Sequence, residues 1–137
     1  MHSLADAQDQ MIPFVPLLLL LSSLGLMSVV LVVMGIMGRR RMIRPNRFFG
    51  IRTSYTYSSD LAWYTVHEAA SRWSLLAGVA MLPALALIPA VTTVNGQLAA
   101  TLAPTAVSLT LLFIGMWRAQ RFSRECEARE AGRADLP

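Results

Sequence analysis

The stretch that decides the fold is residues 12–38, IPFVPLLLLLSSLGLMSVVLVVMGIMG, which carries no charged residue. The hydrocarbon core of a bilayer is about 30 Å thick, and a helix needs roughly 20 apolar residues to cross it. Two more uncharged runs follow later in the chain. The three runs predict an all-α integral membrane protein with one domain over 1–137: spans at about 12–38, 73–94 and 98–117, a connection at 39–72 and a tail at 118–137.

The composition supports this fold class. The chain is 55% hydrophobic and 15% charged, which is too apolar and too poor in charge for an ordinary soluble domain. The leader 1–10 holds two aspartates and no arginine, and the first run is followed by Arg39, Arg40 and Arg41. A secretory signal has a positive leader and a small-residue cleavage site, so we interpret the first run as an uncleaved anchor.

Arginine is distributed unevenly between the two sides of the predicted membrane. The connection 39–72 holds seven arginines and the tail five, whereas the leader and the second connection, about 92–97, hold none. Because basic residues near helix ends favour the cytoplasmic side, we predict an outside N-terminus and a cytoplasmic C-terminus. The absence of lysine is typical of a GC-rich bacterial genome. The net charge of +4 is then explained by topology and by anionic lipid headgroups, and we expect no nucleic-acid partner.

The connection 39–72 is rich in aromatic residues and arginine. Rings of this kind favour the headgroup zone, so we expect an ordered interfacial element. Pro45 ends the first helix, and Ser58 to Asp60 are helix-starting residues for a helix that continues into the second span. Its spacing predicts one face with Tyr64, His67, Glu68 and Ser71, a second face with Trp63, Val66 and Ala70, a Glu68–Arg72 ion pair, and later a tight outer turn at Asn95–Gly96.

Residues that carry chemistry are few. No metal-ligand spacing and no glycine-rich phosphate loop is present, Cys126 is alone, and no ionisable residue lies in the spans. We therefore expect no enzyme activity, no cofactor and no metal. Arg47 and Arg52 flank Gly50 and could hold a phosphate-bearing headgroup, or they could only fix topology. His67 fits a satisfied interface residue better than a pH sensor.

One motif in the connection points to a family. Residues 44–53 read RPNRFFGIRT, and Thr56, Ser58 or Ser59, Trp63 and His67 follow. This closely resembles the signature loop of the SdpI family of small bacterial membrane proteins, Pro-Asn-x-x-x-Gly-x-Arg-Thr-Pro-x-Thr followed by serine, Trp, and Asn or His. The resemblance covers about 25 residues. Ser54 departs from it, because the family usually has proline there.

The resemblance implies a non-enzymatic protein that protects the cytoplasmic membrane against a peptide toxin or senses the toxin. It also implies a binding site for lipid headgroups or a partner in the signature loop: Asn46, Arg47, Gly50, Arg52, Thr53, Thr56, Trp63 and His67. The polar members would organise the loop or bind a headgroup, and Trp63 and His67 would pack it against the helix ends. The alternative is an accessory subunit of a larger membrane complex, such as a transporter or a respiratory enzyme.

Overall fold

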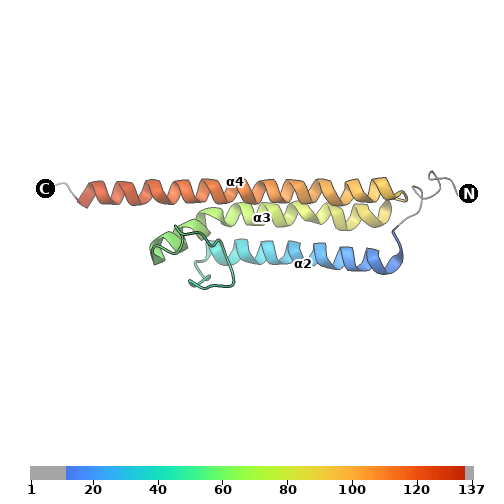
Figure 1. The fold of residues 1–137 in the computed structure, drawn as a ribbon, viewed down its shortest axis with the longest axis horizontal. Helices are drawn as coiled ribbons and strands as arrows, with labels where there is room; N and C mark the ends of the chain where they lie inside the picture. The colour runs from blue at the N-terminus through green and yellow to red at the C-terminus, as the bar shows by residue number, and fades with distance from the viewer. Residues whose placement is uncertain (1–11, 135–137) are drawn as a thin grey trace, which may run out of the picture.

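The computed structural model describes residues 12–134, which form three helices and no strand. They are α2 (Phe14–Arg39), α3 (Asp60–Ala90) and α4 (Val94–Ala134), and they run side by side along the length of the molecule (Figure 1). Each is long and apolar enough to cross a membrane. The all-α class and the three membrane helices are therefore confirmed.

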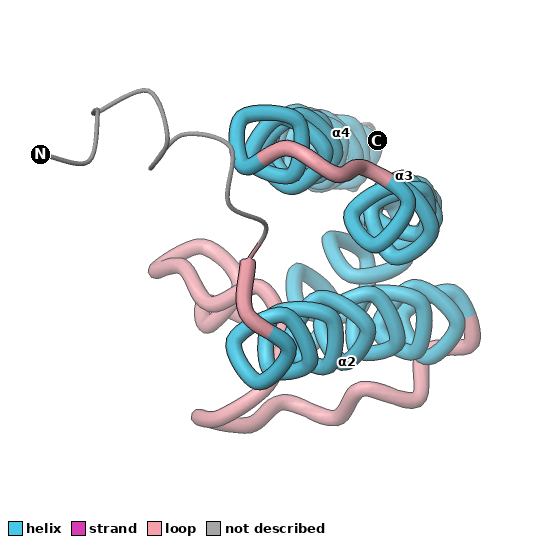
Figure 2. Tube along the Cα trace, turned by 90° about the vertical axis from the view of Figure 1, so that its right-hand side faces the viewer, coloured by secondary structure: helices cyan, strands magenta, loops and turns pink. Residues whose placement is uncertain are grey.

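Helix α3 is the centre of the bundle. It packs against both α2 and α4, whereas α2 and α4 hardly touch each other, and the end view shows them on either side of α3 (Figure 2). The core between the helices is built from small and branched apolar residues: Leu24, Leu31, Ala77, Met81, Ala84 and Ile88. Large apolar side chains such as Leu19, Leu26 and Phe113 point outward, as expected where lipid is the solvent.

Small residues bring α2 and α3 close together. The Ser28 hydroxyl donates a 2.8 Å hydrogen bond to the Gly78 carbonyl of α3. A Cβ on Gly38 would lie 2.7 Å from the carbonyl oxygen of His67. Tight backbone contact of this kind replaces the hydrophobic effect as the source of helix association in lipid.

The two connections differ in length and in how well they were predicted. Residues 91–93 join α3 to α4, so the predicted turn at Asn95–Gly96 is wrong, since both residues lie in the first turn of α4. The Thr93 hydroxyl accepts a hydrogen bond from the Gly96 N–H at 3.3 Å, which is the geometry of a helix N-cap. We call this end of the bundle the turn end, and the end that carries residues 40–59 the loop end.

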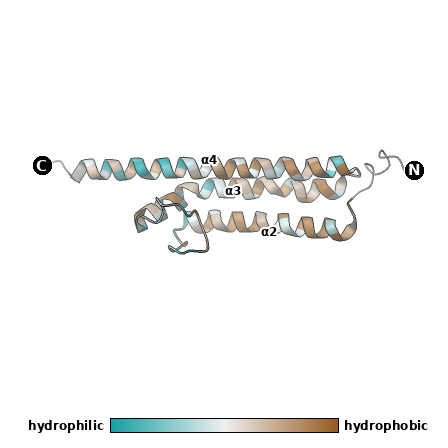
Figure 3. Ribbon diagram, in the orientation of Figure 1, coloured by the Kyte–Doolittle hydropathy of each residue, from teal (hydrophilic) through white to brown (hydrophobic). Residues whose placement is uncertain are grey.

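Polar residues begin at the loop end. Helix α4 is apolar along the bundle and polar beyond Trp117 (Figure 3), and it continues as one helix to Ala134. In this polar part of α4, Arg121 and Glu125 form an i, i+4 ion pair at 3.2 Å. Helix α3 likewise carries its charged residues before Trp73, so its first turns, 60–72, are more polar than the rest of the helix.

Candidate functional site

The loop 40–59 leaves α2 through a sharp reversal at Arg41. This residue has φ 54°, and its Nε donates to the Glu68 carboxylate at 2.7 Å. The predicted Glu68–Arg72 pair is therefore wrong: Glu68 binds the arginine that follows α2, and the Arg72 guanidinium lies 5.5 Å from the centroid of the Trp73 ring. The ion pair connects the end of α2 to α3.

Asn46 shapes the first half of the loop. Its Oδ1 accepts hydrogen bonds from the N–H groups of Phe48 and Phe49 at 2.9 and 2.7 Å, and its Nδ2 donates to the Arg44 carbonyl at 2.7 Å. An asparagine that bonds to the backbone two residues ahead is a common turn former. The Tyr57 hydroxyl donates to the Asn46 carbonyl at 2.9 Å. The Asn46 side chain thus holds the loop's own backbone.

Gly50 and His67 meet at the centre of the site. Gly50 has φ 108°, which side-chain-bearing residues rarely adopt, and a Cβ there would overlap the His67 imidazole. The Ile51 N–H donates to Nε2 of His67 at 2.8 Å, so Nδ1 carries the proton and donates to the Trp63 carbonyl at 2.7 Å. Burial lowers the pKa of His67, and the Trp63 carbonyl offsets this in part.

Thr53 and Thr56 close the second half of the loop. The Thr53 N–H donates to the Thr56 hydroxyl at 2.9 Å, and the Thr56 N–H donates to the Thr53 hydroxyl at 3.2 Å. The Thr56 hydroxyl also donates to the Ile51 carbonyl at 2.9 Å. Because Thr56 is 1% exposed, its hydroxyl organises the loop from inside.

Trp63 is the apolar centre of the loop end. It is completely buried, its Nε1 donates to the Ile43 carbonyl at 2.8 Å, and its ring lies 4.4 Å from that of His67. His67 and Ser71 are buried together with Trp63, whereas Glu68 is exposed. The predicted division of this helix into two faces is therefore wrong for His67 and Ser71. The loop covers the His67 imidazole at Gly50 and Ile51, whereas Ser71 lies against α2, since a Cβ on Gly38 would be 3.6 Å from the Ser71 Cβ.

The loop also contacts α4, which sequence reasoning missed. The Tyr55 hydroxyl donates to the Ser123 hydroxyl at 2.9 Å, and burial raises the pKa of Tyr55. Ser123 is 1% exposed, and Ala119 joins Val66 and Ala70 in a small apolar cluster. The sequence did hold a signal for this contact. Ala119 and Ser123 are small residues four positions apart, on one face of the part of α4 that is otherwise rich in charged residues.

Two of the proposed site residues remain at the surface. Arg47 and Arg52 are exposed, and the Arg52 guanidinium donates to the Arg47 carbonyl. Phe48, beside Arg47, is 91% exposed. The structure thus separates the eight residues into an inner group that holds the loop and an outer group that faces solvent or a headgroup layer: Asn46, Gly50, Thr53, Thr56, Trp63 and His67 inside, and Arg47 and Arg52 outside.

The described residues contain no group of three or more His, Cys, Asp and Glu that could hold a metal ion. In the same part of the chain, every buried side-chain nitrogen and oxygen has a hydrogen-bond partner. The loop end is therefore a closed polar network with a basic, aromatic outer surface.

The fold and the loop together define a class: a three-helix membrane protein whose long connection folds back as a hydrogen-bonded cap over one end of the bundle. The sequence model of the SdpI/YfhL protein family matches residues 42–116, which include the network from Ile43 to His67, the whole of α3 and the first part of α4. The chain belongs to this family. No curated protein and no solved structure matches the chain significantly.

Proposed function

We propose that this protein is a non-enzymatic member of its family that protects the bacterial cytoplasmic membrane against a peptide toxin or senses the toxin. The observation that supports this is the construction of the loop. Its inner side chains form hydrogen bonds with the backbone of the loop itself, so the loop is an ordered surface for binding. Its outer surface presents Arg47, Arg52 and the exposed ring of Phe48.

The outer surface suits an anionic group beside an apolar one. Guanidinium groups match the oxygens of phosphate and carboxylate, and an exposed aromatic ring favours the headgroup zone of a membrane. A membrane-active peptide that has inserted through the bilayer, or the cytoplasmic-leaflet headgroups that it disturbs, would meet both features at the loop. We propose that binding there, and no chemical step, is how the protein acts.

The proposal includes a topology with the loop end in the cytoplasm and the N-terminus outside. Cysteine labelling in intact cells, on a Cys126→Ser background, tests it. Thr92 lies in the turn and Ser54 in the loop, and both are exposed. We expect an impermeant reagent to label Thr92→Cys and not Ser54→Cys, and the opposite pattern would refute the topology.

Expression in a toxin-sensitive bacterium tests the function. Cells that carry the chain are exposed to a membrane-active secreted peptide toxin of the class against which the family's founding member protects. Survival and the retained membrane potential are compared with those of cells that carry the empty vector. We expect more survivors and a slower loss of potential. Equal killing, with the protein shown to be present in the membrane, would contradict the proposal.

The arrangement of the helices favours one second candidate, an accessory subunit. Helices α2 and α4 flank α3 without closing on each other, and large apolar side chains remain exposed on both. A larger membrane protein could cover these faces. Recovery of one stoichiometric membrane partner after purification in a mild detergent would support this function over toxin protection.

A further inference from the structure

We propose that a groove between α3 and α4 at the loop end binds the phosphate of an anionic phospholipid. The groove has a volume of about 920 Å³ and is lined by side chains of both helices together with Arg39 of α2. None of the described residues between 40 and 67 lines it. The site is therefore distinct from the outer surface of the loop and does not depend on the function proposed for it.

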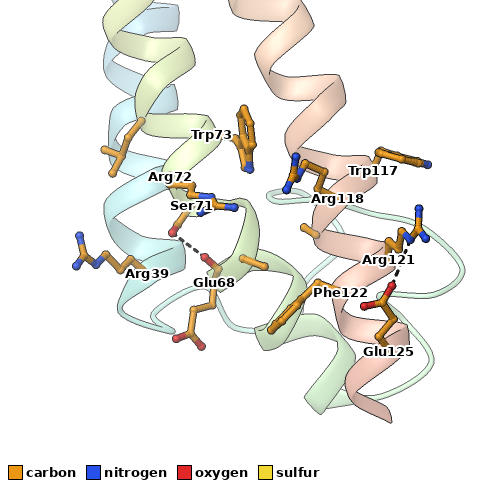
Figure 4. A pocket seen from close by; sticks show the side chains of 13 residues that line it. Arg39, Glu68, Ser71, Arg72, Trp73, Trp117, Arg118, Arg121, Phe122 and Glu125 are labelled. Atoms are coloured by element: carbon orange, nitrogen blue, oxygen red, sulfur yellow. Dashed lines mark hydrogen bonds and ion pairs between the residues drawn. The ribbon is translucent and has the colours of Figure 1, made fainter. Parts of the chain in front are cut away.

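Two arginines from different helices meet on one aromatic ring in this groove. The guanidinium carbons of Arg72 on α3 and Arg118 on α4 lie 5.5 and 5.9 Å from the centroid of the Trp73 ring. The close view shows the Arg72 guanidinium below this ring and the Arg118 guanidinium beside it, both directed toward the space between the helices (Figure 4). Cation–π contact orients the two charges, so the groove has a fixed basic centre.

The charges in the groove are not balanced within the described residues. Its two carboxylates are occupied, since Glu68 binds Arg41 and Glu125 binds Arg121. Arg72 and Arg118 form no ion pair with any described carboxylate, and the same holds for Arg39. The guanidinium groups of Arg72 and Arg118 thus both face the space between the helices, and paired N–H donors of this kind match phosphate oxygens.

The position of the groove, at the ends of the uncharged parts of α3 and α4, favours a lipid over a soluble phosphate. Trp73 and Trp117 both line the groove and stand at the borders of uncharged runs, where tryptophan marks the membrane interface. Beyond them, toward the membrane, lie the exposed apolar side chains of Leu76 and Phe113. A headgroup phosphate at the arginines would place its acyl chains along this surface.

Native mass spectrometry of the delipidated full-length protein tests the proposal. Phosphatidylglycerol, phosphatidylethanolamine and inorganic phosphate are titrated separately onto the wild type and onto two double variants. Arg72→Gln/Arg118→Gln removes the groove charges, and Arg40→Gln/Arg44→Gln removes two charges whose side chains are exposed. We expect the groove variant to bind phosphatidylglycerol at least about tenfold more weakly, the loss for a hydrogen-bonded charge, and the control to match the wild type.

Three outcomes would overturn the site. Equal losses in both double variants would mean that only total charge matters. Equal affinity for phosphatidylglycerol and phosphatidylethanolamine would remove the anionic specificity. Inorganic phosphate that binds as tightly as phosphatidylglycerol would identify a soluble ligand in place of a lipid. If the groove variant fails to fold, the single variant Arg118→Gln, checked by its thermal unfolding, supplies the same comparison.

Discussion

At both ends of the bundle, side chains hydrogen-bond to backbone groups and hold the helix ends together, but the two ends use different numbers of residues. At the turn end the Thr93 cap is joined by one central side chain: Gln97 Nε2 donates to the carbonyls of Ile88 and Val91 at 3.3 and 3.1 Å, and its Oε1 accepts from the Ile12 N–H at 3.0 Å. Gln97 thus ties together the ends of all three helices. At the loop end the same task takes a network of side chains from Asn46 to His67.

The difference indicates where function lies. Backbone groups near the membrane must be satisfied within the protein, and at the turn end Thr93 and the buried amide of Gln97 provide such partners. A long loop is not needed for that purpose. The loop end adds an exposed basic and aromatic surface, which the turn end does not have among its described residues, and the inner network serves to hold this surface in place.

The largest effect is expected from Gly50→Ala. The substitution puts a Cβ at φ 108° and against the His67 imidazole, which costs about 2 to 4 kcal/mol from backbone strain and overpacking. Unfolding in a denaturing detergent should show this loss, and toxin protection should fall with it. Gly132→Ala is the control, because a Cβ there meets nothing within 4 Å. If the two variants are equally stable, the loop does not hold its structure through His67.

Gln97→Leu tests the turn end. It leaves the Ile12 N–H and the carbonyls of Ile88 and Val91 without this partner, and an unsatisfied buried group costs about 1 to 3 kcal/mol. Stability should fall while toxin protection at equal membrane levels stays unchanged, and Thr92→Ala, at an exposed position, should change neither. Loss of protection in a folded Gln97→Leu protein would mean that the two ends are coupled.

The stability of the loop end should depend on pH through His67. Burial lowers its pKa in the folded protein, so below about pH 6.5, the usual value for histidine, the unfolded chain binds more protons. The contribution of neutral His67 to the free energy of unfolding is therefore complete above about pH 6.5. It decreases as the pH falls, because a protonated Nε2 cannot accept the Ile51 N–H. Unfolding between pH 5 and 8 measures it, and His67→Gln should flatten the curve. An unchanged slope in that variant would assign the effect to another group.

The three membrane helices and the family could be predicted from the sequence, because uncharged runs and the motif of the loop are local signals. The sequence could not predict contacts that depend on where the loop returns. The pairing of Glu68 with Arg41 in place of Arg72 requires the turn at Arg41, and the Tyr55–Ser123 contact joins residues that are 68 positions apart. The burial of His67 likewise follows from the loop that covers it, not from the spacing along α3.

The smallest change in stability, and the sharpest test of the outer surface, is the comparison of Arg52→Ala with Arg40→Ala. Each variant removes one exposed charge at the loop end, and surface changes of this kind usually alter stability by no more than about 0.5 kcal/mol. Arg52, however, donates to the Arg47 carbonyl and so holds the outer surface in one arrangement, whereas the Arg40 side chain lies exposed beside the end of α2. We expect Arg52→Ala to lose most of the toxin protection and Arg40→Ala to keep it, with both proteins present at wild-type levels. Equal survival of the two strains would show that the loop end acts through its total charge, and the comparison between the two ends of the bundle would then be one of charge alone.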